Sequence, residues 1–230
     1  MTHANLSIFE RILQDILDGK MASGALTHEN ELAKLYGVSR TPIREALGAL
    51  EYSGIIKRER GGIRITEPTP IEILQIYNVK AALEGEVGRE AAINRTDIDL
   101  SILSTLLDAS HEAYQQSREN IIQLNSQFHH AMREASHNRI LVEMLDRLDI
   151  NLSRFRETTM VHQGRLEQIL VQHRKLLDAV SDGNSDEAMA IGQQHTMDAR
   201  SIRLERFSVE SSVPELDLAT AHLTGLFDMQ

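Results

Sequence analysis

The 230-residue sequence contains no cysteine and no tryptophan, and only 5 phenylalanines and 4 tyrosines. The lack of thiols excludes disulfides and thiolate metal sites, and a reducing cytoplasm is the expected location. No apolar run approaches the roughly 20 residues that a membrane span needs. The first residues also lack the basic and apolar segments of a signal peptide. We therefore expect a cytoplasmic protein with no membrane partner.

Charge is distributed unevenly along the chain, whose formal net charge is −10. Residues 1–66 carry 9 basic and 8 acidic side chains, whereas residues 67–230 carry 15 basic and 26 acidic ones. Within residues 34–64 there are 7 basic and 3 acidic side chains. This pattern indicates a small basic unit, suited to nucleic acid, attached to an acidic body.

The stretch "GVSRTPIREALGAL" predicts a helix with basic side chains at its start. Apolar residues recur there at i, i+3, i+4 and i+7, namely Ile43, Ala46, Leu47 and Leu50. Thr41 is the expected N-cap, and Pro42 suits the first helical position. Arg40 and Arg44 lie at the end where the helix dipole already favours anions. Basic side chains at this end lower the stability of the helix slightly, and an external anion such as a DNA phosphate would compensate for that loss.

The neighbouring segments complete the pattern of a winged helix-turn-helix. Residues 6–17 form an amphipathic helix, and "LTHENELAKLYG" forms a second, with Thr27 as N-cap and Leu32, Ala33 and Leu35 facing inward. After the third helix, "IIKRERGGIRITEP" predicts a short hairpin with a basic tip. The N-terminal residues of a recognition helix enter the major groove, so we expect Ser39, Arg40, Thr41 and Arg44 to contact phosphates and base edges.

The rest of the chain predicts an all-α bundle. Pro68 and Pro70 mark a linker, and residues 71 to about 210 read as roughly six helices, with breaks near residues 95–97, 136–138, 160–164 and 181–185. The predicted fold is therefore mainly α, with an N-terminal winged helix-turn-helix in residues 1–68 and an all-α helical-bundle effector domain in residues 69–230. The role of the tail, residues 212–230, is left open.

Three of the ten histidines lie on or beside the apolar stripes of three successive predicted helices: His129, His173 and His195. Asn125 precedes His129 by one turn, whereas His130 points nearly opposite. Each histidine alone is more often a satisfied core residue. Burying three imidazoles without partners would be costly, and one shared divalent cation would satisfy them together. Three imidazoles with one oxygen donor suit Zn²⁺, Ni²⁺ or Mn²⁺.

The segment "ENELAKLYGVSRTPIREALGALEYSGIIKRERGGIRI" resembles the DNA-binding domain of GntR-family transcription regulators. The resemblance implies a homodimer that binds double-stranded operator DNA at two half-sites. It also implies DNA contacts by Arg40, Thr41 and Arg44, with Gly61 and Gly62 at the tip of the wing. One departure is Ser23, where the family usually has a proline.

Three further segments, "QFHHAMREASHN", "QHRKLLDAV" and "GQQHTMDA", resemble the FCD effector domain of the FadR subfamily. Many members bind a metal there through an acidic residue and three histidines, which correspond here to Asn125, His129, His173 and His195. Asn125 departs from the usual aspartate. Lys80 stands where the family often has an arginine that holds a carboxylate, and it can pair with an effector anion without a bidentate fork.

These patterns favour a transcription regulator whose operator affinity responds to a small organic acid bound beside the metal, and not an enzyme. One alternative is a metalloenzyme acting on small organic acids, since three histidines with an open position are also a catalytic arrangement. No H-E-x-x-H motif supports it. The other alternative is a DNA-binding protein with no metal, whose histidines belong to the core.

Overall fold

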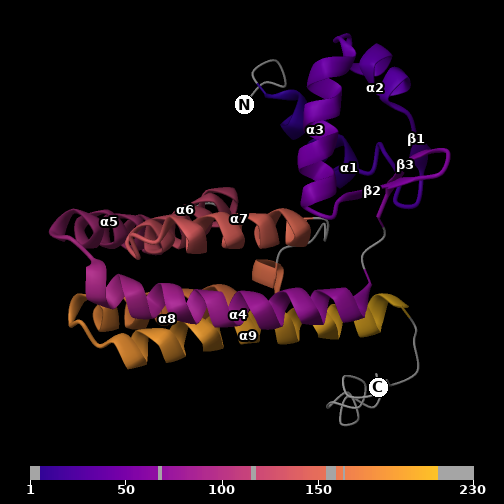
Figure 1. Ribbon diagram of the computed structural model, residues 1–230. Coiled ribbons are helices and arrows are strands. Elements are labelled where there is room, and N and C mark those ends of the chain that lie inside the picture. Colours follow the sequence, from indigo (N-terminus) through magenta and orange to yellow (C-terminus); the bar gives the residue numbers. More distant parts are fainter. Residues whose placement is uncertain (1–5, 67–68, 115–117, 154–158, 163, 212–230) are drawn as a thin grey trace, which may run out of the picture.

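The N-terminal part of the chain is a three-helix unit with a small sheet (Figure 1). The computed structural model describes residues 6–66, 69–114, 118–153, 159–162 and 164–211. The first elements are α1 (Ile8–Leu17), β1 (Leu26–Thr27), α2 (Glu29–Tyr36), α3 (Arg40–Tyr52), β2 (Ile56–Glu59) and β3 (Gly62–Ile65). The antiparallel sheet has the order β1-β3-β2. The predicted hairpin is confirmed, and β1, which was not predicted, adds a third strand.

The predicted apolar stripe of α3 is confirmed, because Ile43, Ala46, Leu47 and Leu50 are all buried. They pack with Ile12 of α1 and with the apolar residues of β2 and β3. The predicted N-caps are wrong. The helix α3 begins at Arg40 with Ser39 as its N-cap, and α2 begins at Glu29 with His28 as its N-cap. Thr27 instead pairs with Ile63 in the sheet.

The C-terminal part forms two layers of helices (Figure 1). Its elements are α4 (Pro70–Asn94), α5 (Asp97–Tyr114), α6 (Arg118–Glu134), α7 (Arg139–Ser153), the 3-10 turn η2 (Thr159–Val161), α8 (Arg165–Ser181) and α9 (Ser185–Ser211). In Figure 1, α5, α6 and α7 lie on one side, and α4, α8 and α9 lie on the other. The core between them includes Leu103, Phe128, Leu145 and Val180. Within the described ranges no helix is long and apolar enough to cross a membrane.

Helices α4 and α9 pack at unusually close range, and this contact positions the site. A Cβ built on Gly192 would lie 2.6 Å from the backbone oxygen of Glu84. Such a distance is shorter than carbon and oxygen tolerate, so only glycine lets the two backbones approach here. Gly192 lies one turn before His195 on α9, and the contact therefore brings His195 close to Glu84 of α4.

The two parts touch where the C-terminal half of α7 meets the end of α3. The Arg147 guanidinium lies 3.9 Å from the centre of the Tyr52 ring, within the range of a cation–π contact. Ile150 packs against the apolar core of the N-terminal unit. A Cβ on Gly54 would lie 3.2 Å from Asn151 Oδ1. Helix α7 therefore contacts both the bundle and the winged helix.

Candidate metal centre and DNA-binding face

Three helices bring the predicted histidines together inside the bundle. His129 comes from α6, His173 from α8 and His195 from α9. One nitrogen atom from each ring lies within 4.8 Å of the other two, and the ring centres are 4.9 to 5.0 Å apart. His173 and His195 are buried, and His129 is partly exposed. Among the described residues, this cluster could hold a metal ion.

Two buried polar atoms at the cluster indicate whether its residues could bind a cation. Asn125 Oδ1 and His173 Nε2 are both buried and have no hydrogen-bond partner among the described residues. His173 instead stacks on the Phe128 ring, with centres 4.1 Å apart. Leaving such atoms unsatisfied costs about 1–3 kcal/mol each. A divalent cation accepts lone pairs from an amide oxygen and an imidazole nitrogen, so the donor set fits a metal.

The protonation of the three rings also suits metal binding. Burial, and then the neighbouring His173, lowers the pKa of His129 to about 3. Burial likewise lowers the pKa of His173 and of His195 well below the ordinary value. All three rings are therefore neutral near pH 7, which is the form that ligates metal. His195 Nδ1 lies 2.9 Å from Gln172 Oε1, so Nδ1 donates a proton there and Nε2 keeps its lone pair.

His130 lies on the opposite side of α6, as predicted. Its side chain is exposed, and Nε2 lies 4.0 Å from a carboxylate oxygen of Glu134. It therefore provides an internal control for the three clustered histidines.

A cavity of about 440 Å³ opens beside the cluster. Its lining includes the predicted residues Lys80, Asn125, His129 and His195. It also includes five charged residues that the sequence analysis missed: Glu84, Arg133, Asp149, Arg165 and Arg203. Two of these could have been found from helical spacing, because Glu84 lies four residues after Lys80 and Arg133 lies four residues after His129. The cavity is large enough for a small organic molecule.

Four of the lining side chains form a connected ionic network. Lys80 Nζ donates to Glu84 Oε1 at 3.0 Å and to Asp149 Oδ1 at 2.5 Å. Arg133 Nη2 lies 2.7 Å from both Glu84 Oε1 and Asp149 Oδ2. Burial raises the pKa of Glu84, but the charges of Lys80 and Arg133 outweigh it and hold that pKa far below its usual range. The network is therefore ionised.

Arg165 is a further cation at the cavity, which Lys80, Arg133 and Arg203 also line. Its side chain is buried, and Nη2 donates to the backbone oxygen of His195 at 3.0 Å, while Nη1 donates to Gln168 Oε1 at 2.8 Å. The nearest carboxylate oxygen, on Asp198, is 3.8 Å from Nη1. Its Nε has no hydrogen-bond partner in the described part of the chain. Burial lowers the pKa of Arg165 from its usual value.

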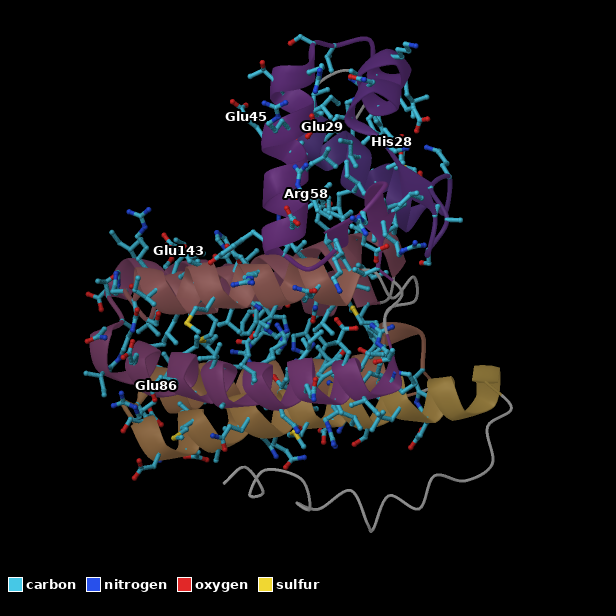
Figure 2. All side chains as sticks on the ribbon, turned by 45° about the vertical axis from the view of Figure 1, so that its right-hand side comes forward. His28, Glu29, Glu45, Arg58, Glu86 and Glu143 are labelled. Carbon is cyan, nitrogen blue, oxygen red and sulfur yellow. The ribbon has the colours of Figure 1, made fainter. Side chains whose placement is uncertain are left out.

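The start of α3 presents the predicted DNA-contacting side chains to solvent. Ser39, Arg40, Thr41 and Arg44 are exposed or partly exposed. Glu29, at the start of α2, gathers three arginines: it lies 3.5 Å from Arg40, 3.3 Å from Arg44 and 3.0 Å from Arg58. Hydrogen bonds from Arg58 and Arg44 lower the pKa of Glu29 to about 2. Figure 2 shows Glu29 and Arg58 beside α3.

The wing tip contains Gly61 and Gly62, with φ values of 110° and 147°. A Cβ on Gly62 would lie 2.7 Å from the backbone oxygen of Thr27 in the neighbouring strand. Gly62 is therefore required by the close approach of β1 and by its backbone conformation. A Cβ on Gly61 would meet only Leu26 Cδ2, at an ordinary contact distance of 4.0 Å.

Family models match both parts of the chain. Residues 5–65 match the model for bacterial regulatory proteins of the gntR family, and residues 75–198 match the FCD domain. The HTH-type transcriptional regulator YdhC of Bacillus subtilis is 33% identical over 84% of this chain and 85% of its own length. This chain belongs to the GntR family.

Other GntR relatives cover nearly the whole chain. The Glc operon transcriptional activator of Escherichia coli is 27% identical over 94% of this chain and 91% of its own length. The solved structure of E. coli McbR/YncC has the same fold, with a TM-score of 0.70 and 22% identity over 90% of this chain and all of that one. The GntR protein described here is accordingly a DNA-binding transcriptional regulator with an FCD domain, and not an enzyme. The metalloenzyme alternative is therefore wrong.

Proposed function

We propose that this GntR regulator is a cytoplasmic homodimer whose operator affinity is controlled by a small organic acid bound beside a divalent metal. The DNA-binding domain occupies residues 1–68 and the effector domain residues 69–230. The observation that supports the metal is the pair of buried unsatisfied atoms, Asn125 Oδ1 and His173 Nε2, at a cluster of three neutral imidazoles.

The proposed metal site consists of His129, His173 and His195, with Asn125 as the weakest ligand. This donor set suits Zn²⁺, Ni²⁺ or Mn²⁺. Once bound, the ion would supply a positive centre for a carboxylate or hydroxyl oxygen of the effector. Asn125 is neutral, so the site keeps one more positive charge than a site with aspartate there, which favours an anionic effector.

The charges around the cavity support an acid as the effector. Lys80 and Arg133 lie on one part of the lining, and Arg165 is a buried cation whose nearest carboxylate is 3.8 Å away. Buried arginine is more stable with an anion in direct contact. A molecule with a carboxylate and additional hydroxyl or carboxylate oxygens matches these cations together with a metal.

A thermal-shift titration of the full chain tests this proposal. The protein is stripped with a chelator, reloaded with Zn²⁺, Ni²⁺ or Mn²⁺ in turn, and screened against carboxylic and sugar acids. A ligand at about 100 times its dissociation constant adds about 2.7 kcal/mol. An acid that raises the melting temperature only of the metal-loaded protein, and changes its affinity for a selected DNA duplex, is expected. If no acid does both with any metal, the proposed function is wrong.

We expect Arg44→Ala to weaken specific DNA binding by about 1–3 kcal/mol, because an arginine at this position would contact a base edge. The fold should be kept, since the Arg44 side chain is 63% exposed. Fluorescence anisotropy at fixed salt, on a duplex selected by the wild-type protein, measures the effect. Arg139→Ala is the control, because its side chain is 90% exposed on α7. Equal affinities of the two variants would contradict the assignment of Arg44.

We expect a dimer in solution, with twice the 25.9 kDa mass of the chain. Two recognition helices are needed to read two half-sites on one face of the duplex. Multi-angle light scattering at micromolar concentration measures the mass. A monomer mass under these conditions would rule out the proposed homodimer.

The stability of the metal-free protein should fall as the pH drops below about 6.5. In the folded protein the pKa of each of the three histidines is lowered, so below about pH 6.5 the unfolded chain binds protons that the folded chain does not. The stability that is fully present above about pH 6.5 is therefore lost as the pH falls towards the pKa values of the folded state. Each such histidine adds a slope of about 1.4 kcal/mol per pH unit. Urea unfolding between pH 8 and pH 5, in the presence of a chelator, measures how the free energy of unfolding depends on pH. His173→Phe should flatten the curve, and an unchanged slope would contradict the burial of a neutral ring.

A further inference from the structure

The carboxylate of Asp149 lies between two cations of the cavity lining. Its Oδ1 accepts from Lys80 at 2.5 Å, and its Oδ2 lies 2.7 Å from Arg133 Nη2. Each oxygen therefore faces a different cation, as the two oxygens of a free carboxylate would. The side chains of Lys80 and Arg133 are mostly buried, at 14% and 5% exposure, and both line the cavity.

Of the two carboxylates in the network, Asp149 is the one that can leave. Glu84 is only 8% exposed and lies on the same helix as Lys80, one turn away. The Asp149 side chain is 42% exposed and comes from α7, 69 residues away from Lys80. If Asp149 moves into water, its carboxylate regains hydration, and Lys80 and Arg133 keep Glu84 as a charged partner.

Helix α7 also carries the contacts to the winged helix. Asp149 lies between residues that touch that domain: Arg147 stacks on Tyr52, Ile150 packs into its core, and Asn151 lies beside Gly54. The same two turns of helix therefore face the cavity on one side and the DNA-binding domain on the other. A displacement of Asp149 would disturb these contacts directly.

We propose that Asp149 is a tethered carboxylate that occupies the anion subsite formed by Lys80 and Arg133, and that a carboxylate ligand displaces it. Displacement removes the ion pairs that Asp149 of α7 makes with Lys80 of α4 and Arg133 of α6, and it changes the contact between Arg147 and Tyr52. The inference rests on the proposed function, because it assumes that an organic acid enters this cavity. It adds that the protein's own side chain competes with that acid and transmits its binding to the DNA-binding domain.

Acetate is a suitable probe, because it presents the same carboxylate as the Asp149 side chain. The sequence has no tryptophan, so Tyr52→Trp introduces a single fluorescent reporter that keeps an aromatic ring under Arg147. In this background, acetate is expected to change the emission saturably at constant ionic strength. Asp149→Asn is expected to change the emission without acetate and to tighten acetate binding by about tenfold or more, equivalent to about 1.4 kcal/mol.

Asp146→Asn is the matched control. Asp146 lies on the same helix and pairs with the same arginine, at 3.3 Å from Arg133 Nη1, but it does not line the cavity. It should leave both emission and acetate affinity close to those of the parent. If Asp149→Asn behaves like Asp146→Asn, the inference is wrong. If Asp149→Asn does not fold, the acetate titration of the Tyr52→Trp parent decides, since no saturable change would equally overturn it.

The failure of this inference can be separated from failure of the proposed function. A protein whose DNA affinity responds to an acid and a metal, but whose Asp149→Asn variant binds acetate like the parent, keeps the proposed function and loses the inference. A protein in which acetate displaces Asp149, but no acid alters DNA binding, loses the proposed function and keeps the competition at the subsite.

Discussion

Replacing His173 by alanine is expected to abolish metal binding and to remove the thermal stabilisation that the metal provides. His173 is buried in the bundle, and its Nε2 has no hydrogen-bond partner in the described ranges. Loss of one of three imidazoles leaves a site with two, which lowers affinity by orders of magnitude for Zn²⁺, Ni²⁺ or Mn²⁺. Elemental analysis of protein purified without a histidine tag, after exposure to each metal, gives the content directly.

Two further variants separate ligation from general damage to the bundle. His130→Ala changes a histidine on the exposed face of α6 and should keep both the metal and the melting temperature. Asn125→Asp places a charged oxygen where a buried amide oxygen has no hydrogen-bond partner among the described residues, and it should tighten binding. If the wild type and His173→Ala hold the same sub-stoichiometric amount of every metal, the three histidines are only core residues.

Much of the fold could be predicted from local patterns in the sequence. The apolar stripe of α3 and the basic hairpin each depend on residues close together in the chain, and both are confirmed. The errors are at element ends, where local patterns compete. Leu35 was expected to face inward but is 67% exposed, and Tyr36 is buried instead. Its hydroxyl donates to Asp15 at 2.7 Å, a contact 21 residues away that the pattern within one helix cannot show.

The N-cap of α3 illustrates the same limit. Thr41 and Ser39 are both good capping residues, and a proline is tolerated anywhere in the first turn because the amides there have no helical partner. Ser39 takes an extended backbone conformation, with φ −69° and ψ 170°, and the helix begins one residue later at Arg40. Arg40 and Arg44 remain exposed, so the expected DNA-binding face does not depend on the error.

The histidine cluster of the candidate site could be predicted from the sequence, but the ionic network beside it could not. The histidines could be found because each lies on or beside an apolar stripe of its own helix. The ionic network joins residues far apart in sequence: Arg133 and Glu84 are 49 residues apart, and Lys80 and Asp149 are 69 apart. The spacing of residues within one helix cannot show that either of these two pairs is in contact. Asp149 in particular looks like an ordinary solvent-facing residue of α7 until α4 and α6 are placed beside it.

Arg133→Met is expected to lower the free energy of unfolding by about 3–5 kcal/mol, the usual cost of removing one partner of a buried ion pair. The Arg133 side chain is only 5% exposed and lies 2.7 Å from Glu84, which is itself 8% exposed. Without the arginine, Glu84 keeps only Lys80 as a charged partner. Urea unfolding followed by circular dichroism at pH 7 measures the change.

Arg139→Met provides a control with nearly the same contact in a different environment. Arg139 Nε lies 2.7 Å from Glu143 Oε1, but its side chain is 90% exposed. Exposed pairs contribute about 0–1 kcal/mol, so this variant should remain close to the wild type. A comparable loss in both variants would show that burial does not set the cost.

The double variant Glu84→Gln with Arg133→Met identifies the origin of the loss. If the cost of Arg133→Met comes from a buried carboxylate without its main partner, neutralising Glu84 should recover a large part of it. If the double variant is as unstable as Arg133→Met alone, the arginine stabilises the bundle through packing, and the charge of Glu84 is not the cause. The buried network would then be a structural support for the cavity and not the anion-binding surface that its charges indicate.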